Sequence, residues 1–109
     1  MHLYIGNKEV PVKWENNDSV TALKKLLPLT ISMSKFGGFE QVGSLGHKIV
    51  SNDRQTKTKP GDIVLYSSRQ LVMFYGTNSW AYTRLGHLDL SKEEIRDLLD
   101  RNNVTVTLK

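Results

Sequence analysis

The chain has 109 residues, of which 39% are hydrophobic and 24% charged, and no cysteine, so we expect one domain over residues 1–109 without disulfide bonds, thiolate catalysis or cysteine metal ligands. Its net charge of +4 suggests nucleic acid as a partner, but the densest basic cluster, Arg54, Lys57 and Lys59, is more typical of a solvated loop. The N-terminus has no signal-peptide pattern and no apolar run is long enough to cross a bilayer, so we expect a cytoplasmic protein with no membrane partner.

The N-terminal half alternates short β-prone segments with one helix. Gly6-Asn7-Lys8 separates the first two segments and predicts a hairpin, while Pro11 indicates a strand start or an edge. Asp18 or Ser19 can cap a helix, and Pro28 would stop it. The apolar stripe of that helix is Val20, Leu23, Leu26 and Leu27. The strands expected here are 2–6, 10–14, 29–36 and 39–43.

The C-terminal half begins with a polar stretch, residues 43–60, that predicts a long ordered loop with a short strand near 55–57. Pro60-Gly61-Asp62 predicts a tight turn. Ser91 and Glu94 form a capping box, which places the start of a second helix with Ile95, Leu98 and Leu99 as its buried stripe. The remaining strands expected here are 62–68, 71–76, 80–88 and 104–108.

The tight turns between these segments predict antiparallel pairing of seven or eight strands. An antiparallel sheet of this size usually closes or splits into two layers, because free edges invite aggregation. Two amphipathic helices could cover the open ends of a small barrel. We therefore predict a mainly β fold, a closed antiparallel barrel with two helices.

The segment 72–89 holds four of the nine aromatic residues. In its first strand both faces are apolar, so the outward face is either covered by a helix or loop, or left as an apolar groove. In the next strand Trp80, Tyr82 and Arg84 share one face. That arginine could flank a binding groove, or it could be a surface arginine stacked on a ring.

Patterns for catalysis are weak. His87 and Asp89 could share a face with Ser67 near them, but no nucleophile elbow is present, and surface histidines are the better interpretation. No histidine pair has metal-ligand spacing, and the glycine-containing stretches lack the lysine and hydroxyl of a phosphate loop. We therefore expect no metal and no cofactor, and we assign no catalytic residue.

Five segments, "LPLTISM", "KPGDIVLY", "LVMFYG", "YTRLG" and "NVTVTL", together resemble a bacterial family of small cyclophilin-like proteins. The resemblance covers nearly the whole chain. It implies a closed eight-stranded barrel with two capping helices, and it implies no particular activity. The chain departs from the cyclophilin isomerases, which carry an arginine in an F-H-R-type strand and a Q-G-G-D-F-type segment, because neither is present.

The leading hypothesis is a cyclophilin-like binding module that holds a peptide or small molecule in an aromatic and arginine groove. The alternative is a peptidyl-prolyl isomerase with a non-standard site, in which Arg84 polarises the prolyl amide and Phe74 or Trp80 holds the ring. The expected groove residues are Phe74, Tyr75, Trp80, Tyr82 and Arg84, with Met33, Phe36 and Tyr66 from neighbouring strands.

Overall fold

The computed structural model describes residues 1–109 and contains ten strands and two helices. The helices are α1 (Asp18–Lys24) and α2 (Lys92–Leu99). The strands are β1 (Leu3–Ile5), β2 (Lys8–Val10), β3 (Val12–Trp14), β4 (Leu29–Phe36), β5 (Glu40–Ser44), β6 (Arg54–Lys57), β7 (Asp62–Tyr66), β8 (Gln70–Phe74), β9 (Ser79–Leu88) and β10 (Asn103–Leu108). They form an antiparallel sheet in the order β2–β1–β10–β4–β5–β8–β7–β9–β3, and β6 pairs with β9 off this path.

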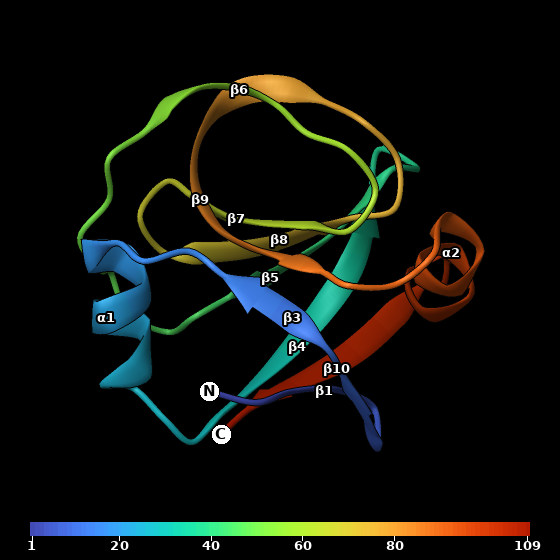
Figure 1. Cartoon of the computed structure of the whole chain (residues 1–109), viewed down its shortest axis with the longest axis horizontal. Coiled ribbons are helices and arrows are strands. Elements are labelled where there is room, and N and C mark those ends of the chain that lie inside the picture. The colour runs from blue at the N-terminus through green and yellow to red at the C-terminus, as the bar shows by residue number, and fades with distance from the viewer.

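The sheet closes on itself at Pro11. β2 and β3 lie at opposite ends of the strand order, yet only Pro11 separates them in sequence. Because proline has no N–H for a ladder, pairing passes here from β1, the partner of β2, to β9, the partner of β3. When β2 and β3 are counted as one interrupted strand, the fold is the predicted closed eight-stranded barrel (Figure 1).

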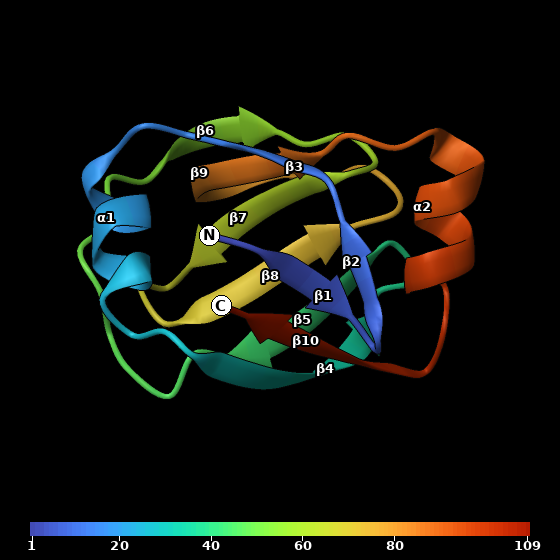
Figure 2. The ribbon, with the colours of Figure 1, turned by 60° about the horizontal axis from the view of Figure 1, so that its bottom comes forward.

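The two helices cover the two open ends of the barrel, as Figure 2 shows. α1 inserts Val20 and Leu23 into the interior, and α2 inserts Ile95 and Leu99. The predicted capping box of α2 is confirmed. The cap predicted for α1 was wrong by one or two positions, because it is the Asn17 side chain that accepts a hydrogen bond from the N–H of Val20 at 2.9 Å.

Neither helix is long and apolar enough to cross a membrane. They are seven and eight residues long.

The core has two parts, which lie on opposite faces of the same sheet. The interior cluster fills the barrel and includes Ile31 and Met33 of β4, whose polar neighbours in the alternating pattern face outward. A smaller outer cluster contains Val64, Val72, Phe74 and Tyr82, with Phe39, Val42 and Tyr66 packed against it. The two-sided apolar character of residues 71–75 therefore reflects a strand that is buried on both faces.

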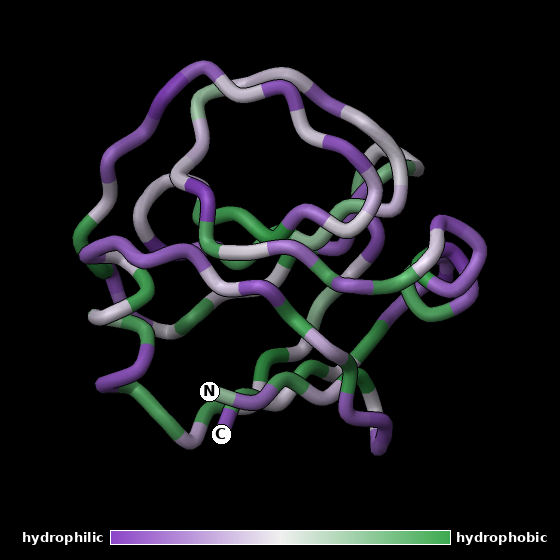
Figure 3. The backbone as a smooth tube through the Cα atoms, viewed as in Figure 1, coloured by the Kyte–Doolittle hydropathy of each residue, from purple (hydrophilic) through white to green (hydrophobic).

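An arch stands on the outside of the barrel and consists of residues 50–57 and 79–82 (Figure 1). β6 confirms the short strand predicted near residues 55–57. The arch is mostly hydrophilic along its course, in contrast to the barrel strands (Figure 3). Two hydrogen bonds fix its first part: Ser19 Oγ donates to the Val50 carbonyl at 2.6 Å, and Asn52 N donates to Thr83 Oγ1 at 2.9 Å.

Candidate functional site

Two cavities adjoin the arch, and Tyr82 of β9 lines both. The first, which we call the aromatic groove, has a volume of about 270 Å³ and lies over the outer face of the barrel. Its lining residues come from five strands and from the turn that precedes β9: Phe36, Glu40, Val42, Tyr66, Gln70, Asn78, Trp80 and Tyr82. Five of the eight are hydrophobic, which is the usual character of a ligand-binding concavity with a few polar groups.

The floor of the aromatic groove is rigid because it is built from stacked and edge-on rings. Phe74 is fully buried, with its ring parallel to that of Phe39 at 6.5 Å and edge-on to that of Tyr82 at 5.6 Å. Tyr66 makes a second edge-on contact with Tyr82 at 6.0 Å. Such pairs add to the stabilisation from apolar burial alone. Tyr82 is held further by a 2.9 Å hydrogen bond that Asn78 Nδ2 donates to its hydroxyl.

Two aromatic residues at this groove are exposed. Phe36, the last residue of β4, is 65% exposed, and Trp80 of β9 is 57% exposed. Both belong to the small set of large hydrophobic side chains that the fold leaves in solvent. Because exposed apolar side chains gathered at one concave place mark interaction sites, this arrangement distinguishes the groove from ordinary surface.

Glu40 carries the only carboxyl group in the aromatic groove, and its side chain is almost completely buried. In the sheet register it lies directly between Phe36 of β4 and Phe74 of β8, on the same face as both. Desolvation raises the pKa of its carboxyl to about 7, with no charged or hydrogen-bonding partner to oppose that effect. Burial also raises the pKa of the Tyr82 hydroxyl, and the nearby Glu40 charge adds to this shift.

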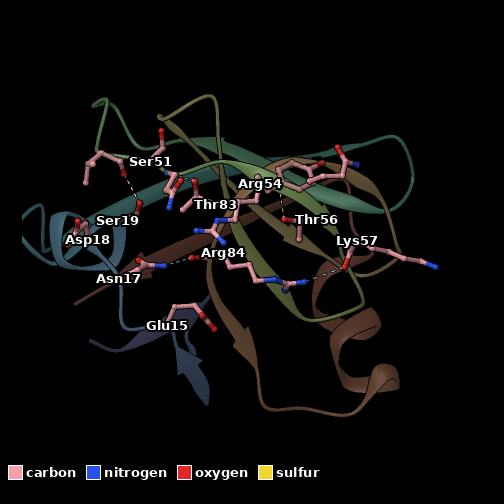
Figure 4. Close-up of a pocket in the computed structure, with 14 residues that line it drawn as sticks. Glu15, Asn17, Asp18, Ser19, Ser51, Arg54, Thr56, Lys57, Thr83 and Arg84 are labelled. Atoms are coloured by element: carbon pink, nitrogen blue, oxygen red, sulfur yellow. Dashed lines mark hydrogen bonds between the residues drawn. The ribbon is translucent and has the colours of Figure 1, made fainter.

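The second cavity, which we call the polar cavity, is larger, about 970 Å³, and only two of its fourteen lining residues are hydrophobic. It lies between the start of α1, β6 and the middle of β9 (Figure 4). Arg84 crosses it: its Nη2 donates to the Lys57 carbonyl at 3.3 Å, and its Nη1 donates to Asp62 Oδ2 at 3.1 Å. The backbone carbonyl of Arg84 accepts a 2.8 Å hydrogen bond from Asn17 Nδ2.

Asp62 is buried, and its carboxylate is hydrogen-bonded to other residues of the protein. Its carboxylate accepts hydrogen bonds from Arg84, from the backbone N–H of Lys59 at 3.0 Å and from His87 Nδ1 at 2.8 Å. The partner of His87 is therefore Asp62, across the sheet, rather than Asp89 two positions along the same strand. This cluster joins β7 to β9, and its charges are already matched.

Four of the eight residues predicted from the sequence lie together in the aromatic groove: Phe36, Tyr66, Trp80 and Tyr82. The other four do not line it. Phe74 is in the floor beneath, Met33 and Tyr75 are in the barrel interior, and Arg84 is in the polar cavity. The predicted set combined residues from both faces of β4 and of β8, and only one face of each strand is directed to the groove.

The basic residues considered for nucleic acid lie elsewhere in the fold. Arg54 and Lys57 line the polar cavity, where Glu15 and Asp18 provide charges of the opposite sign (Figure 4). The cavity therefore presents mixed charge rather than the uniform basic surface that a phosphate backbone attracts.

Four residues of the aromatic groove were not predicted: Glu40, Val42, Gln70 and Asn78. Alternation in the expected strand 39–43 does place Glu40 and Val42 on one face. However, a glutamate at the beginning of a strand is usually solvated, and no sequence signal indicates that the arch and Phe36 enclose this one.

Comparison with known proteins gives a match to a family model. No curated protein matches the chain. The family model described as "Cyclophilin-like family" matches residues 3–109, a span that includes all ten strands and both helices. Because this match covers nearly the whole chain, and because the closed barrel with a helix at each end is the architecture that the sequence resemblance implied, the protein belongs to the cyclophilin-like family.

Proposed function

We propose that the protein is a binding module that holds a peptide side chain or a small ligand in the aromatic groove. The observation that carries this proposal is the pair of exposed rings, Phe36 and Trp80, beside a concave surface with a rigid aromatic floor. A ligand that covers such rings gains roughly 25 cal/mol for each Å² of apolar surface removed from water. The fold holds the floor in place before binding, which lowers the cost of ordering it.

The size and polarity of the groove support a small binding group. A volume of about 270 Å³ is slightly below the range typical of drug-sized ligands and suits one side chain or one small ring. Gln70 and Asn78 supply amide groups at the lining, which can pair with the backbone of an extended peptide.

Binding is a better-supported proposal than prolyl isomerisation. The isomerase hypothesis required Arg84 beside the aromatic residues, but Arg84 lines the polar cavity and is paired with Asp62. No lysine, arginine or histidine lines the aromatic groove. The groove therefore has a platform for a proline ring and no cation to polarise the prolyl amide.

The test is an NMR titration of ¹⁵N-labelled protein with N-acetylated, C-amidated tetrapeptides Ala-Xaa-Pro-Ala, in which Xaa is alanine, norleucine, lysine or glutamate. We expect shifts at the Trp80 indole and at the backbone of Tyr82 and Glu40, without faster cis/trans exchange in the peptides. Accelerated exchange would support the isomerase instead, and the absence of shifts with every peptide would contradict the proposal.

Two variants control this experiment. Trp80→Ala removes an exposed wall of the groove and should reduce the shifts. Arg84→Met alters the polar cavity alone and should leave them unchanged; loss of binding in this variant would transfer the site to the polar cavity.

A further inference from the structure

The protein has two buried carboxylates, and they differ in whether other residues hydrogen-bond to them. Asp62 accepts hydrogen bonds from a backbone N–H, an arginine and a histidine. Glu40 is nearly as buried, at 6% exposed, and has no such partner. A buried charge is costly unless it is paired. Within one small domain, the fold therefore satisfies one carboxylate and leaves the other free at the surface of a cavity.

The surroundings of Glu40 offer it no cationic partner within the protein. The other titratable groups that line the groove are the hydroxyls of Tyr66 and Tyr82, and the latter is bonded to Asn78. On the neighbouring strand, Lys35 is paired with Asp100, 2.7 Å from Nζ to Oδ1. No cation of the protein lines the groove, so a cationic partner for Glu40 has to enter it from outside.

The walls of the groove favour one kind of charged group. Aromatic faces attract cations through the negative potential of their π systems, and alkylated ammonium groups are suited to such sites because they are weakly hydrated. Phe36 and Trp80 are exposed at the groove, and Tyr66 and Tyr82 complete its aromatic lining. An anion would be repelled by Glu40, and a neutral apolar group would leave its charge unmatched.

From this arrangement we infer that the groove recognises an ammonium or alkylammonium group, with the Glu40 carboxylate as its counter-charge and the rings of Phe36, Tyr66, Trp80 and Tyr82 as its walls. The inference rests on the proposed binding function and narrows it to a class of ligand. The same chemistry is offered by a free quaternary amine and by a methylated lysine side chain, which the experiment separates.

Recognition of a cation by Glu40 should depend on pH. The pKa of Glu40 in the unliganded protein is raised to about 7 by desolvation, so the carboxyl is mostly protonated at pH 6 and mostly ionised at pH 8. A cation prefers the ionised form, and its binding therefore releases a proton over this interval. Affinity for a cation should rise from pH 6 to pH 8, whereas affinity for a neutral ligand should not.

The experiment compares choline chloride with its neutral isostere 3,3-dimethylbutan-1-ol, followed through the Trp80 indole resonance. At pH 8 we expect choline to bind at least tenfold more tightly than the isostere, and this ratio should fall several-fold at pH 6. Glu40→Gln should abolish the preference. Glu15→Gln is the matched control, because it removes an exposed carboxylate from the polar cavity, and it should preserve the preference.

The peptide arm uses the tetrapeptides Ala-Xaa-Pro-Ala with Xaa as trimethyllysine or norleucine. Tighter binding of the trimethyllysine peptide than of choline would identify a polypeptide as the source of the cation, and tighter binding of choline than of that peptide would identify a free amine. Equal affinity for each cation and its neutral counterpart, or unchanged choline binding in Glu40→Gln, would overturn the inference while leaving the proposed function intact.

Failure of the proposed binding function can be distinguished from failure of the proposed role of Glu40. If no probe of either arm shifts the groove resonances, the proposed function fails together with the inference. The pH series on the unaltered protein keeps the inference testable even where Glu40→Gln does not fold, since a choline affinity that stays constant from pH 6 to pH 8 would contradict a role for Glu40.

Discussion

The two cavities beside the arch share the Tyr82 ring and differ in how their charges are satisfied. In the polar cavity, Arg84 is matched by Asp62, and hydrogen bonds join α1, the arch and β9. In the aromatic groove, one carboxylate has no partner and two large rings are exposed. A ligand gains free energy where the protein has left groups unsatisfied. Although the polar cavity is more than three times larger, the aromatic groove is the better candidate site.

The largest effect should come from the floor of the aromatic groove. Phe74→Ala removes a fully buried ring and its contacts with Phe39 and Tyr82, and should lower the free energy of unfolding by about 3–5 kcal/mol. Urea denaturation measures this loss. The control is Phe36→Ala, which removes a ring that is mostly exposed and should cost about 0.5 kcal/mol or less. Equal losses in the two variants would show that the floor is not a packed core.

The raised pKa of Glu40 should make the free energy of unfolding depend on pH. The folded-state pKa of Glu40, about 7, lies above the ordinary value of 4.5. The folded state therefore binds more protons between these pH values, and stability falls as the pH rises from 4.5 to 7. The full shift corresponds to about 3 kcal/mol, which screening by water at the open groove reduces to about 2 kcal/mol.

The test is urea denaturation of the unaltered protein and of the Glu40→Gln variant, measured side by side at several pH values. The difference in unfolding free energy between the two proteins should change in favour of the variant between pH 4.5 and pH 7, and other titrating groups cancel in that difference. A constant difference would mean that the Glu40 carboxyl is solvated or paired.

A smaller effect is expected in the polar cavity. Arg84→Met removes one of three donors to Asp62 and should lower the free energy of unfolding by about 1 kcal/mol, because the arginine is partly exposed and two donors are retained. Ligand binding in the aromatic groove should stay the same. Thermal denaturation gives the first quantity, and peptide titration gives the second. A loss of peptide affinity in this variant would show that both cavities take part in binding the peptide.

The smallest effect on stability should be that of Trp80→Ala. Its side chain is more exposed than buried, so the free energy of unfolding should change by about 0.5 kcal/mol or less. Its effect on ligand affinity should be a loss of about tenfold, because it removes a wall of the groove. Isothermal calorimetry with the best-binding peptide, alongside denaturation, tests this separation. A large loss of stability would mean that the ring supports the arch rather than a ligand.

Local patterns predicted most of the secondary structure because the physics behind them is local. Alternation over residues 29–36 predicted β4 with the correct bounds, and the Ser91 capping box predicted the start of α2. The short β6 was expected near residues 55–57, although few apolar residues mark it. The cap of α1 was displaced because Asn17, Asp18 and Ser19 are all good caps, and the choice between them depends on the bond from Asn17 to β9.

The candidate site was only half predictable. Alternation grouped Trp80, Tyr82 and Arg84 on one face of β9, but Trp80 and Arg84 are four residues, or about 13 Å, apart along a long strand that passes from one cavity to the other. Trp80 and Arg84 therefore serve different surfaces. Met33 and Tyr75 were assigned to the groove although alternation places them on the opposite strand faces from Phe36 and Phe74, and both lie in the barrel interior.

The sequence by itself determined the alternating strands, the two capped helices, the tight turns and, through its resemblance to a family, the closed barrel. Only the tertiary structure decided which apolar face lies inside, that β9 leaves the barrel to pair with β6, and that Glu40 is enclosed between Phe36 and Phe74. The reason is physical: propensity, capping and alternation act between near neighbours in the chain, whereas burial, desolvation and the pairing of charges depend on residues that only folding brings together.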